Sequence, residues 1–262
     1  MSEVAVQIAR EAADLAKSVR DEAVTDGVDT KSSETDVVTA GDKAVERLVR
    51  DRLAELRPGE SVLGEEEGGE AALDGLRWVV DPIDGTVNYL YGFPFYSVSL
   101  AAQVDGESVA GAVVEPVSGR VWSAAKGCGA FLDGQRLRVS ATERLELSLV
   151  GTGFSYSVRR RTAQARVVGD MLGKVRDIRR AGAASLDLCA VAAGWLDATY
   201  EVGLHRWDWA AGALVATEAG ANLRLPVKDA ADGLGDEMVV CSAPGITERM
   251  ADALREVDAG SV

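Results

Sequence analysis

The part of this chain that most constrains its fold is the stretch Trp78-Val79-Val80-Asp81-Pro82-Ile83-Asp84-Gly85-Thr86-Val87-Asn88. An apolar run that ends in an acid predicts a buried strand with a carboxylate at its C-terminal end, which mounts a site on a rigid element. Pro82 stiffens the following turn, and Gly85 permits an unusual backbone angle. Gly85 and Thr86 also predict the start of a short helix, whose N–H groups would point at an anion. Asp81 and Asp84 thus offer metal ligands beside anion donors.

Asp and Gly are common in turns, so an isolated D-x-x-D-G pattern is more typical of a simple turn. Two further segments change this interpretation. Leu63-Gly64-Glu65-Glu66 lies just upstream and repeats the design of a strand followed by acids. Trp207-Asp208-Trp209-Ala210-Ala211-Gly212 places an Asp at the start of a predicted helix, where alone it would be an N-cap. The three segments together favour one shared acidic site.

The sequence around these segments predicts two halves. Apolar residues at helical spacing predict helices near 4–19 and 45–53, and alternating residues predict an antiparallel meander over 95–139. After about residue 146 strands and helices mix, with strands at 148–151, 198–202 and 238–241 and helices at 160–173, 186–193, 210–219 and 247–257. We expect an N-terminal α+β half (1–146) and a C-terminal α/β half (147–262).

Composition excludes several classes of function. The 262 residues carry a net charge of −14, which repels nucleic acid and anionic lipid surfaces. If the substrate is an anion, bound divalent cations would reverse the sign of the local charge.

The three cysteines (Cys128, Cys189 and Cys241) show no metal or disulfide spacing and are interpreted as small buried residues. No basic signal segment and no apolar run of about 18 residues is present, so we expect a cytoplasmic protein without membrane contact.

The three acidic segments resemble the signature segments of the inositol monophosphatase family. They match its GEE box (64–66), its DPIDGTxN box (81–88) and its WDxAAGxLxxxEAG box (207–220) in order and rough spacing. The stretches 151–154 and 179–189 are similar to bacterial SuhB-type members. The resemblance implies an α+β fold, a layered αβαβα sandwich of the sugar-phosphatase type, and a homodimer.

The resemblance also implies a magnesium site with two or three ions. Glu65, Asp81 and the backbone carbonyl of Ile83 would hold one Mg²⁺, and Asp81, Asp84 and Asp208 a second. A third, weaker ion would lie beside Glu65. Hard oxygen ligands are what Mg²⁺ prefers, and paired ions clamp the attacking and leaving oxygens.

Catalytic and substrate-binding roles follow from the same match. Asp42, Thr86 and Glu65 would lie near the attacking water, with Thr86 passing a proton toward Asp42. Without the resemblance, Asp42 is an acid in the first turn of a helix, favoured there by the helix dipole. The residues implied in substrate binding are Asp84, Gly85, Thr86, Arg179, Gly182, Ala183, Ala184, Glu201 and Asp208. Arg179 is alternatively an interface residue or a solvated charge.

The expected reaction is hydrolysis of a phosphate monoester, foremost myo-inositol monophosphate, by a metal-activated water without a covalent enzyme intermediate. Inhibition by Li⁺ is implied as well. Relatives act on histidinol phosphate, fructose 1,6-bisphosphate or 3′-phosphoadenosine 5′-phosphate, and the shared boxes do not separate these. Ala183 stands where several relatives have a hydroxylated residue, which leaves substrate choice open. Of another class, some SuhB-type proteins act through transcription or ribosome-assembly partners. The lone His205 lacks the arrangement of a histidine phosphatase.

Overall fold

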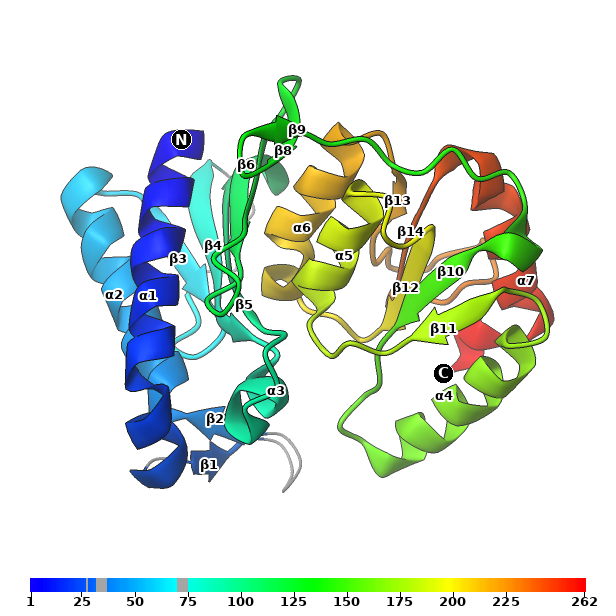
Figure 1. Cartoon of the computed structure of the whole chain (residues 1–262), viewed down its shortest axis with the longest axis horizontal. Helices are drawn as coiled ribbons and strands as arrows, with labels where there is room; N and C mark the ends of the chain where they lie inside the picture. Colours follow the sequence, from blue (N-terminus) through cyan, green and yellow to red (C-terminus); the bar gives the residue numbers. More distant parts are fainter. Residues whose placement is uncertain (27, 32–36, 70–74) are drawn as a thin grey trace.

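Five layers make up the molecule (Figure 1). The computed structural model describes residues 1–26, 28–31, 37–69 and 75–262. Helices α1 (Ser2–Asp26) and α2 (Ala40–Leu56) cover a seven-stranded sheet, and α5 (Ala184–Ala192) and α6 (Arg206–Glu218) lie between it and a five-stranded sheet. Helices α4 (Val158–Met171) and α7 (Thr247–Glu256) cover the far side. The predicted α+β fold, a layered αβαβα sandwich, is confirmed.

The seven-stranded sheet has the order β3-β4-β5-β6-β7-β8-β9. Its first pair, β3 and β4, is parallel, and all other pairs are antiparallel, with β5 to β9 forming the predicted meander. The strands are β3 (Ser61–Gly64), β4 (Leu76–Asp84), β5 (Ser97–Val104), β6 (Glu107–Val114), β7 (Val121–Ala125), β8 (Gly129–Leu132) and β9 (Gln135–Arg136).

The two faces of this sheet belong to different cores. Trp78 and Val80 of β4 pack in the cluster of α1 and α2, whereas Val79 packs in the cluster of α5 and α6. This alternation is the period of two that a strand imposes. On the outer face, small residues of α1 such as Ala5 and Ala12 are fully buried, which brings the helix close to the sheet.

A β-bulge interrupts the pairing of β4 with β5. Asp81 lies opposite Ser99 and Asp84 opposite Ser97, so β4 advances by three residues over the distance that β5 covers with two. The extra residue brings Asp81 and Asp84 to the same face, the face toward α5 and α6. Pro82 suits this place because it has no N–H to donate to the ladder. Without the bulge, the two acids of the D-x-x-D segment would point to opposite faces of the sheet.

The five-stranded sheet has the order β11-β10-β12-β14-β13. Its strands are β10 (Leu149–Thr152), β11 (Asp177–Arg179), β12 (Ala198–Val202), β13 (Asn222–Arg224) and β14 (Met238–Ser242). β10 is parallel to β11 and β12, and β14 is antiparallel to β12 and β13. The sequence did not predict β11 and β13, because each has one apolar residue between polar neighbours. The other short elements are β1 (Val28–Thr30), β2 (Val37–Thr39), α3 (Thr86–Tyr91), η1 (Leu145–Leu147), η2 (Pro244–Ile246) and η3 (Ala259–Ser261).

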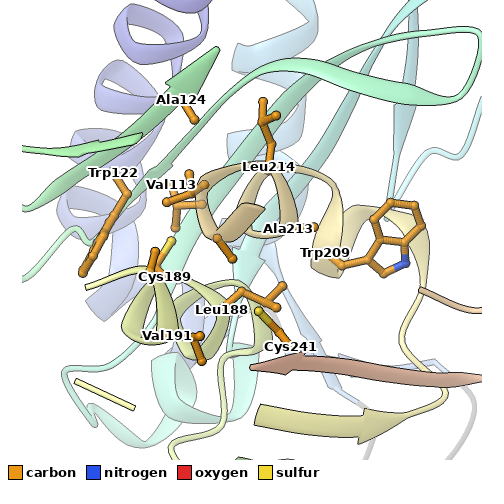
Figure 2. Packing of buried hydrophobic residues seen from close by; sticks show 14 of the residues in the cluster. Val113, Trp122, Ala124, Leu188, Cys189, Val191, Trp209, Ala213, Leu214 and Cys241 are labelled. Atoms are coloured by element: carbon orange, nitrogen blue, oxygen red, sulfur yellow. The ribbon is translucent and has the colours of Figure 1, made fainter. Parts of the chain in front are cut away.

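The central core joins the two predicted halves. Val113 and Trp122 of the seven-stranded sheet pack in one cluster with Leu188 and Leu214 of the middle helices and Cys241 of β14 (Figure 2). The connection between the sheets, where the boundary at 146/147 was expected, runs through η1. The two halves thus share one core.

Two expectations from composition meet different outcomes. Cys189 and Cys241 are buried, but the prediction was wrong for Cys128, which is exposed in the turn between β7 and β8. Among the described residues no helix is both long enough and apolar enough to cross a membrane.

Two helical glycines offer a matched test of the middle layer. A Cβ on Gly212 of α6 would lie 2.9 Å from the Ser185 carbonyl oxygen and 3.0 Å from Leu188 Cβ, whereas one on Gly169 of α4 would meet nothing within 4 Å. Alanine in a helix interior gains about 0.5–1 kcal/mol over glycine, but overpacking costs about 1–3 kcal/mol. We expect Gly212→Ala to lower the melting temperature by about 4 °C and Gly169→Ala to raise it slightly. Equal shifts in thermal unfolding for the two variants would contradict this close packing.

Candidate active site

A cavity of about 420 Å³ is lined by residues from both halves of the chain. The ends of β4, β10 and β12 reach it, and helices α3, α5 and α6 begin at it. Free N–H groups of a helix N-terminus favour anions. Of the predicted site residues, all but Asp42 and Arg179 line this cavity; they are Glu65, Asp81, Ile83, Asp84, Gly85, Thr86, Gly182, Ala183, Ala184, Glu201 and Asp208.

The four predicted metal-binding carboxylates share this space. Burial raises the pKa of Asp81 well above its usual value, and the charges of Glu65, Asp84 and Asp208 raise it further. Burial also raises the pKa of Asp208, again with Asp84 and Glu65 adding to the effect. Acidic side chains that raise one another's pKa lie close together and repel one another. Residues distant in sequence thus converge on one acidic site.

Donors from the protein already hold some of these carboxylates. Glu65 accepts a hydrogen bond from Lys31 Nζ at 2.8 Å, and Asp208 accepts one from the backbone N–H of His205 at 2.6 Å. In this arrangement the described residues contain no group of three His, Cys, Asp or Glu side chains with the geometry of a metal site. Asp81 Oδ1 is buried and lacks a hydrogen-bond partner among the described residues. A cation would satisfy this oxygen, so the residues present fit a divalent metal.

Asp84 is fixed by the first turn of α5. Its carboxylate accepts hydrogen bonds from Ala184 N (3.1 Å), Ser185 N (2.7 Å) and Ser185 Oγ (2.5 Å). The hydroxyls of Ser185 and Ser97 are 2.9 Å apart, and both residues are fully buried. These donors from the C-terminal half orient a carboxylate of the N-terminal half. The sequence analysis missed Ser185, although a hydroxyl just inside a helix start was a usable signal.

Thr86 connects the cavity with Asp42. Its hydroxyl lies 3.2 Å from Asp42 Oδ1 and 3.1 Å from the Ile83 carbonyl oxygen. Asp42 is fully buried behind the cavity and accepts hydrogen bonds from Thr39 N (2.7 Å) and Thr39 Oγ1 (2.6 Å), a capping box at the start of α2. Burial raises the pKa of Asp42 to about 6. This carboxylate can therefore exchange a proton near neutral pH.

Backbone from both halves meets at the predicted substrate-binding segments. Gly85 has φ +93°, and a Cβ there would lie 3.1 Å from the Gly182 carbonyl oxygen and 3.3 Å from Ala183 Cβ. Asn88 Nδ2 donates to the Ala181 carbonyl oxygen at 2.9 Å and so holds the start of α3 against the loop before α5. Only glycine fits at Gly85, because a side chain would strain the backbone and crowd the opposite loop.

Arg179 lies outside the cavity. It is exposed, and its guanidinium donates to Asp177 at 2.5 Å. Its neighbour Arg180 lines the cavity and lies over the Phe154 ring, 5.8 Å from the centroid. Arg179 is the last residue of β11, and Arg180 follows the strand in the loop that leads to α5. Since β11 was not predicted, the sequence could not tell which arginine points inward.

A support lies beneath the GEE segment. Glu46 of α2 is fully buried, accepts hydrogen bonds from Glu66 N (2.8 Å) and Glu67 N (3.1 Å), and pairs with Arg50 at 2.8 Å. A Cβ on Gly64 would collide with the Glu46 carboxylate. The glycine of this box therefore makes room for the acid that holds the following turn.

Two further acids lie at the cavity. Burial raises the pKa of Glu201 to about 7, and it raises the pKa of Asp187 well above its usual value, with the charge of Glu201 adding to the effect. Asp187 of α5 is 4% exposed and was not predicted as a site residue. Its position one turn from Ala183 was the signal that could have revealed it, because residues i and i+4 share a helix face.

Known proteins agree with this architecture. The family model described as "Inositol monophosphatase family" matches residues 1–259. An inositol-1-monophosphatase of Mycobacterium leprae is 56% identical over 237 residues, which cover 87% of this chain and 81% of that protein. Nus factor SuhB of Escherichia coli is 36% identical, covering 84% of this chain and 83% of its own length. The structure of Mycobacterium tuberculosis SuhB superposes with a TM-score of 0.84 at 45% identity, over 98% of this chain and 96% of that one.

The raised pKa values predict how the metal-free protein responds to pH. Acids in unfolded chains have pKa values of about 4, whereas the pKa of Asp84 is raised by burial to about 6 and that of Glu201 to about 7. The folded state therefore binds more protons than the unfolded state between these values, and the free energy of unfolding falls as pH rises through the window. In EDTA we expect a melting temperature about 5 °C higher near pH 5.5 than near pH 8.

Asp81→Asn provides the control for this measurement. It removes one charge without changing shape, so it should raise the melting temperature in EDTA near pH 8. Mg²⁺ should reduce the pH dependence of the unaltered protein, because metal ions bind the deprotonated carboxylates. A melting temperature in EDTA that rises with pH across this window would show that these acids are not held in a repelling cluster.

Proposed function

The chain belongs to the inositol monophosphatase family, and we propose that it hydrolyses a phosphate monoester, with myo-inositol monophosphate as the leading substrate. The observation that carries the proposal is the single cavity onto which Glu65, Asp81, Asp84 and Asp208 converge beside three helix N-termini. Acids suit a divalent cation and helix N-termini suit a phosphate, so the arrangement fits an anionic substrate despite the acidic chain.

Mg²⁺ is the proposed metal. Glu65, Asp81 and the carbonyl of Ile83 would hold one ion, and Asp81, Asp84 and Asp208 another, with a third beside Glu65. When bound there, Mg²⁺ would offset the phosphate charge and lower the pKa of a water molecule. The unpartnered Asp81 Oδ1 and the oxygen-only donor set support this assignment.

Thr86 and Asp42 would handle the proton. Because the Thr86 hydroxyl donates toward Asp42, its lone pairs are free to accept hydrogen from water in the cavity. Burial raises the pKa of Asp42 to about 6, so its carboxylate can take up that proton near neutral pH. Water would attack the phosphorus opposite the leaving alcohol, and no side chain would form a covalent intermediate.

The cavity also offers the charges and donors that hold the substrate. The amide groups at Gly85 and Thr86 would bind phosphate oxygens at the start of α3. Lys31, Arg160 and Arg180 line the cavity and would attract an anion toward it. The resemblance assigns the alcohol portion of the substrate to Glu201 and the segment 182–184. Homodimerisation, expected from the resemblance, stays a prediction.

A role as an interaction protein is the alternative of another class. Relatives named Nus factor SuhB are 42% identical in Pseudomonas aeruginosa and 36% identical in Escherichia coli. Relatives named inositol-1-monophosphatase reach 52–56% in mycobacteria. The acids matched to the family's metal site are all present at the cavity, which favours the enzyme.

Metal removal and Asp84→Asn test the chemistry. EDTA should abolish phosphate release from inositol monophosphate, and Mg²⁺ should restore it. Asp84→Asn should lower kcat at least about 100-fold, because it removes a proposed ligand charge. Asp170→Asn, at an exposed position of α4, should leave the rate unchanged. Activity that persists undiminished after chelation would exclude the mechanism.

The binding role has a separate test. It would be favoured if the Asp84→Asn variant restored growth of cells that lack this protein and if the protein captured transcription factors.

A substrate panel tests the leading assignment. Phosphate release would be compared for inositol monophosphate, histidinol phosphate, fructose 1,6-bisphosphate and 3′-phosphoadenosine 5′-phosphate. We expect a higher kcat/KM for inositol monophosphate than for fructose 1,6-bisphosphate and 3′-phosphoadenosine 5′-phosphate, because Asp187 and Glu201 would repel a second phosphate of the substrate. The preference over histidinol phosphate, which carries one phosphate, rests on the family resemblance. A large preference for any of the other three would move the substrate assignment and leave the phosphatase chemistry in place.

A further inference from the structure

The short helix α3 carries Thr86, whose hydroxyl lies 3.2 Å from Asp42 Oδ1. Its six residues are too few for a helix that is stable by itself, since isolated helices need about 12–15 residues. Contacts with the rest of the chain must therefore hold it in place. Helix α1 lies beside α3 (Figure 1), and none of the proposed site residues belongs to α1. The contacts between these two helices thus bear on the site from outside the cavity.

Arg20 of α1 holds the C-terminal end of α3. Its guanidinium donates hydrogen bonds from Nε to the Tyr89 carbonyl oxygen (2.7 Å) and from Nη2 to the Leu90 carbonyl oxygen (3.1 Å). The last carbonyls of a helix have no partner inside the helix, and a cation suits their partial negative charge. The guanidinium also lies over the Tyr89 ring, 5.8 Å from its centroid. One side chain therefore caps α3 and packs on its Tyr89.

Tyr89 holds the face of α3 that carries Thr86, because residues three apart in a helix share a face. Tyr89 is fully buried, and its hydroxyl donates to the Ala16 carbonyl oxygen of α1 at 2.9 Å. A Cβ on Gly41 would lie 2.7 Å from this hydroxyl, so Tyr89 packs directly against the residue before Asp42. Thr86 and Tyr89 thus contact adjacent residues at the start of α2.

We propose that Arg20 and Tyr89 are positioning residues, which clamp α3 against α1 and α2 and so hold the Thr86 hydroxyl within reach of Asp42. Neither positioning residue belongs to the cavity lining that the structure describes, so both act through Thr86. This role rests on the proposed phosphatase function, in which Thr86 and Asp42 handle the proton. Displacing a reacting group by about 1 Å can cost about 100-fold in rate, so a looser α3 should slow the chemical step.

Arg20→Met tests the clamp, because it removes both hydrogen bonds of the guanidinium and keeps an unbranched apolar side chain. We expect kcat for inositol monophosphate to fall at least about tenfold and KM to change less than about threefold. KM should be spared because Asn88 ties the start of α3 to the Ala181 carbonyl oxygen independently of α1. Arg10→Met, at an exposed position of α1, is the matched control and should change neither value.

Amide hydrogen exchange provides a readout that does not depend on activity. Arg20→Met should speed exchange at the backbone amides of Tyr89, Gly92 and Phe93, which form hydrogen bonds within α3 and its C-terminal cap. Exchange in α6, which Arg20 does not hold, should stay unchanged, because local opening is confined to the segment that loses its contacts. Exchange measured without metal or substrate therefore reports on the clamp alone.

Gly41→Ala tests the contact with Tyr89. The added Cβ would displace the Tyr89 hydroxyl, which lies 2.7 Å from its position, so the variant should lower kcat. Tyr89→Phe removes that oxygen and keeps the ring. The double variant should therefore be faster than Gly41→Ala alone, as expected for two residues that act through one contact. A double variant no faster than Gly41→Ala would overturn the role of Tyr89.

Two outcomes distinguish a clamp from a purely structural residue. If Arg20→Met lowers the melting temperature but leaves kcat per folded molecule unchanged, Arg20 only stabilises the fold and the inference is overturned. Unchanged exchange in α3 would overturn it as well. If the unaltered protein releases no phosphate from inositol monophosphate or the other three substrates, the proposed function fails, and the role of Arg20 and Tyr89 in it fails for that separate reason.

Discussion

The bulge in β4 is the constraint on which the site depends. Along a regular strand Asp81 and Asp84 would point to opposite sides of the sheet. Because β4 uses three residues against two of β5, both carboxylates face the middle helices. Pro82 lies within the irregular stretch and cannot complete a regular ladder. The same bulge leaves Ile83 in the cluster of α1 and α2. One irregularity therefore places Ile83 in the outer core and both acids at the cavity.

Strand β5 then connects the bulge to the middle helices. Ser97, opposite Asp84, contacts Ser185 at the start of α5, and Ser99, opposite Asp81, has a long contact of 3.5 Å to the Trp207 carbonyl at the start of α6. The two residues that face the acids across the sheet thus anchor both helices that complete the site. Glycine at 212 lets α5 and α6 pack closely enough for this arrangement. Convergence of the acids follows from packing, since their mutual repulsion opposes it.

The sequence predicted the parts of the site that local rules govern. A strand ending in acids, a glycine turn and a helix start follow from residues 78–88, and the family resemblance linked them to Glu65 and Asp208. It could not predict the bulge, which needs the register of β5, or the inward direction of Arg180, which needs the unpredicted strand β11. Glu46 escaped notice because a single acid on a helix has no local signature, and only tertiary packing buries it. For Asp187 the one signal was its helical spacing from Ala183.

Ala183 shows how the two ends of the cavity differ. Ser185, two residues after Ala183, donates its hydroxyl to Asp84 at 2.5 Å. Ala183 lines the cavity with a methyl group, whereas Ser185 is fully buried and orients an acid. At the other end of the cavity Asp187 of α5 and Glu201 of β12 lie close enough for the charge of Glu201 to raise the pKa of Asp187, so carboxyl groups line the cavity at both ends.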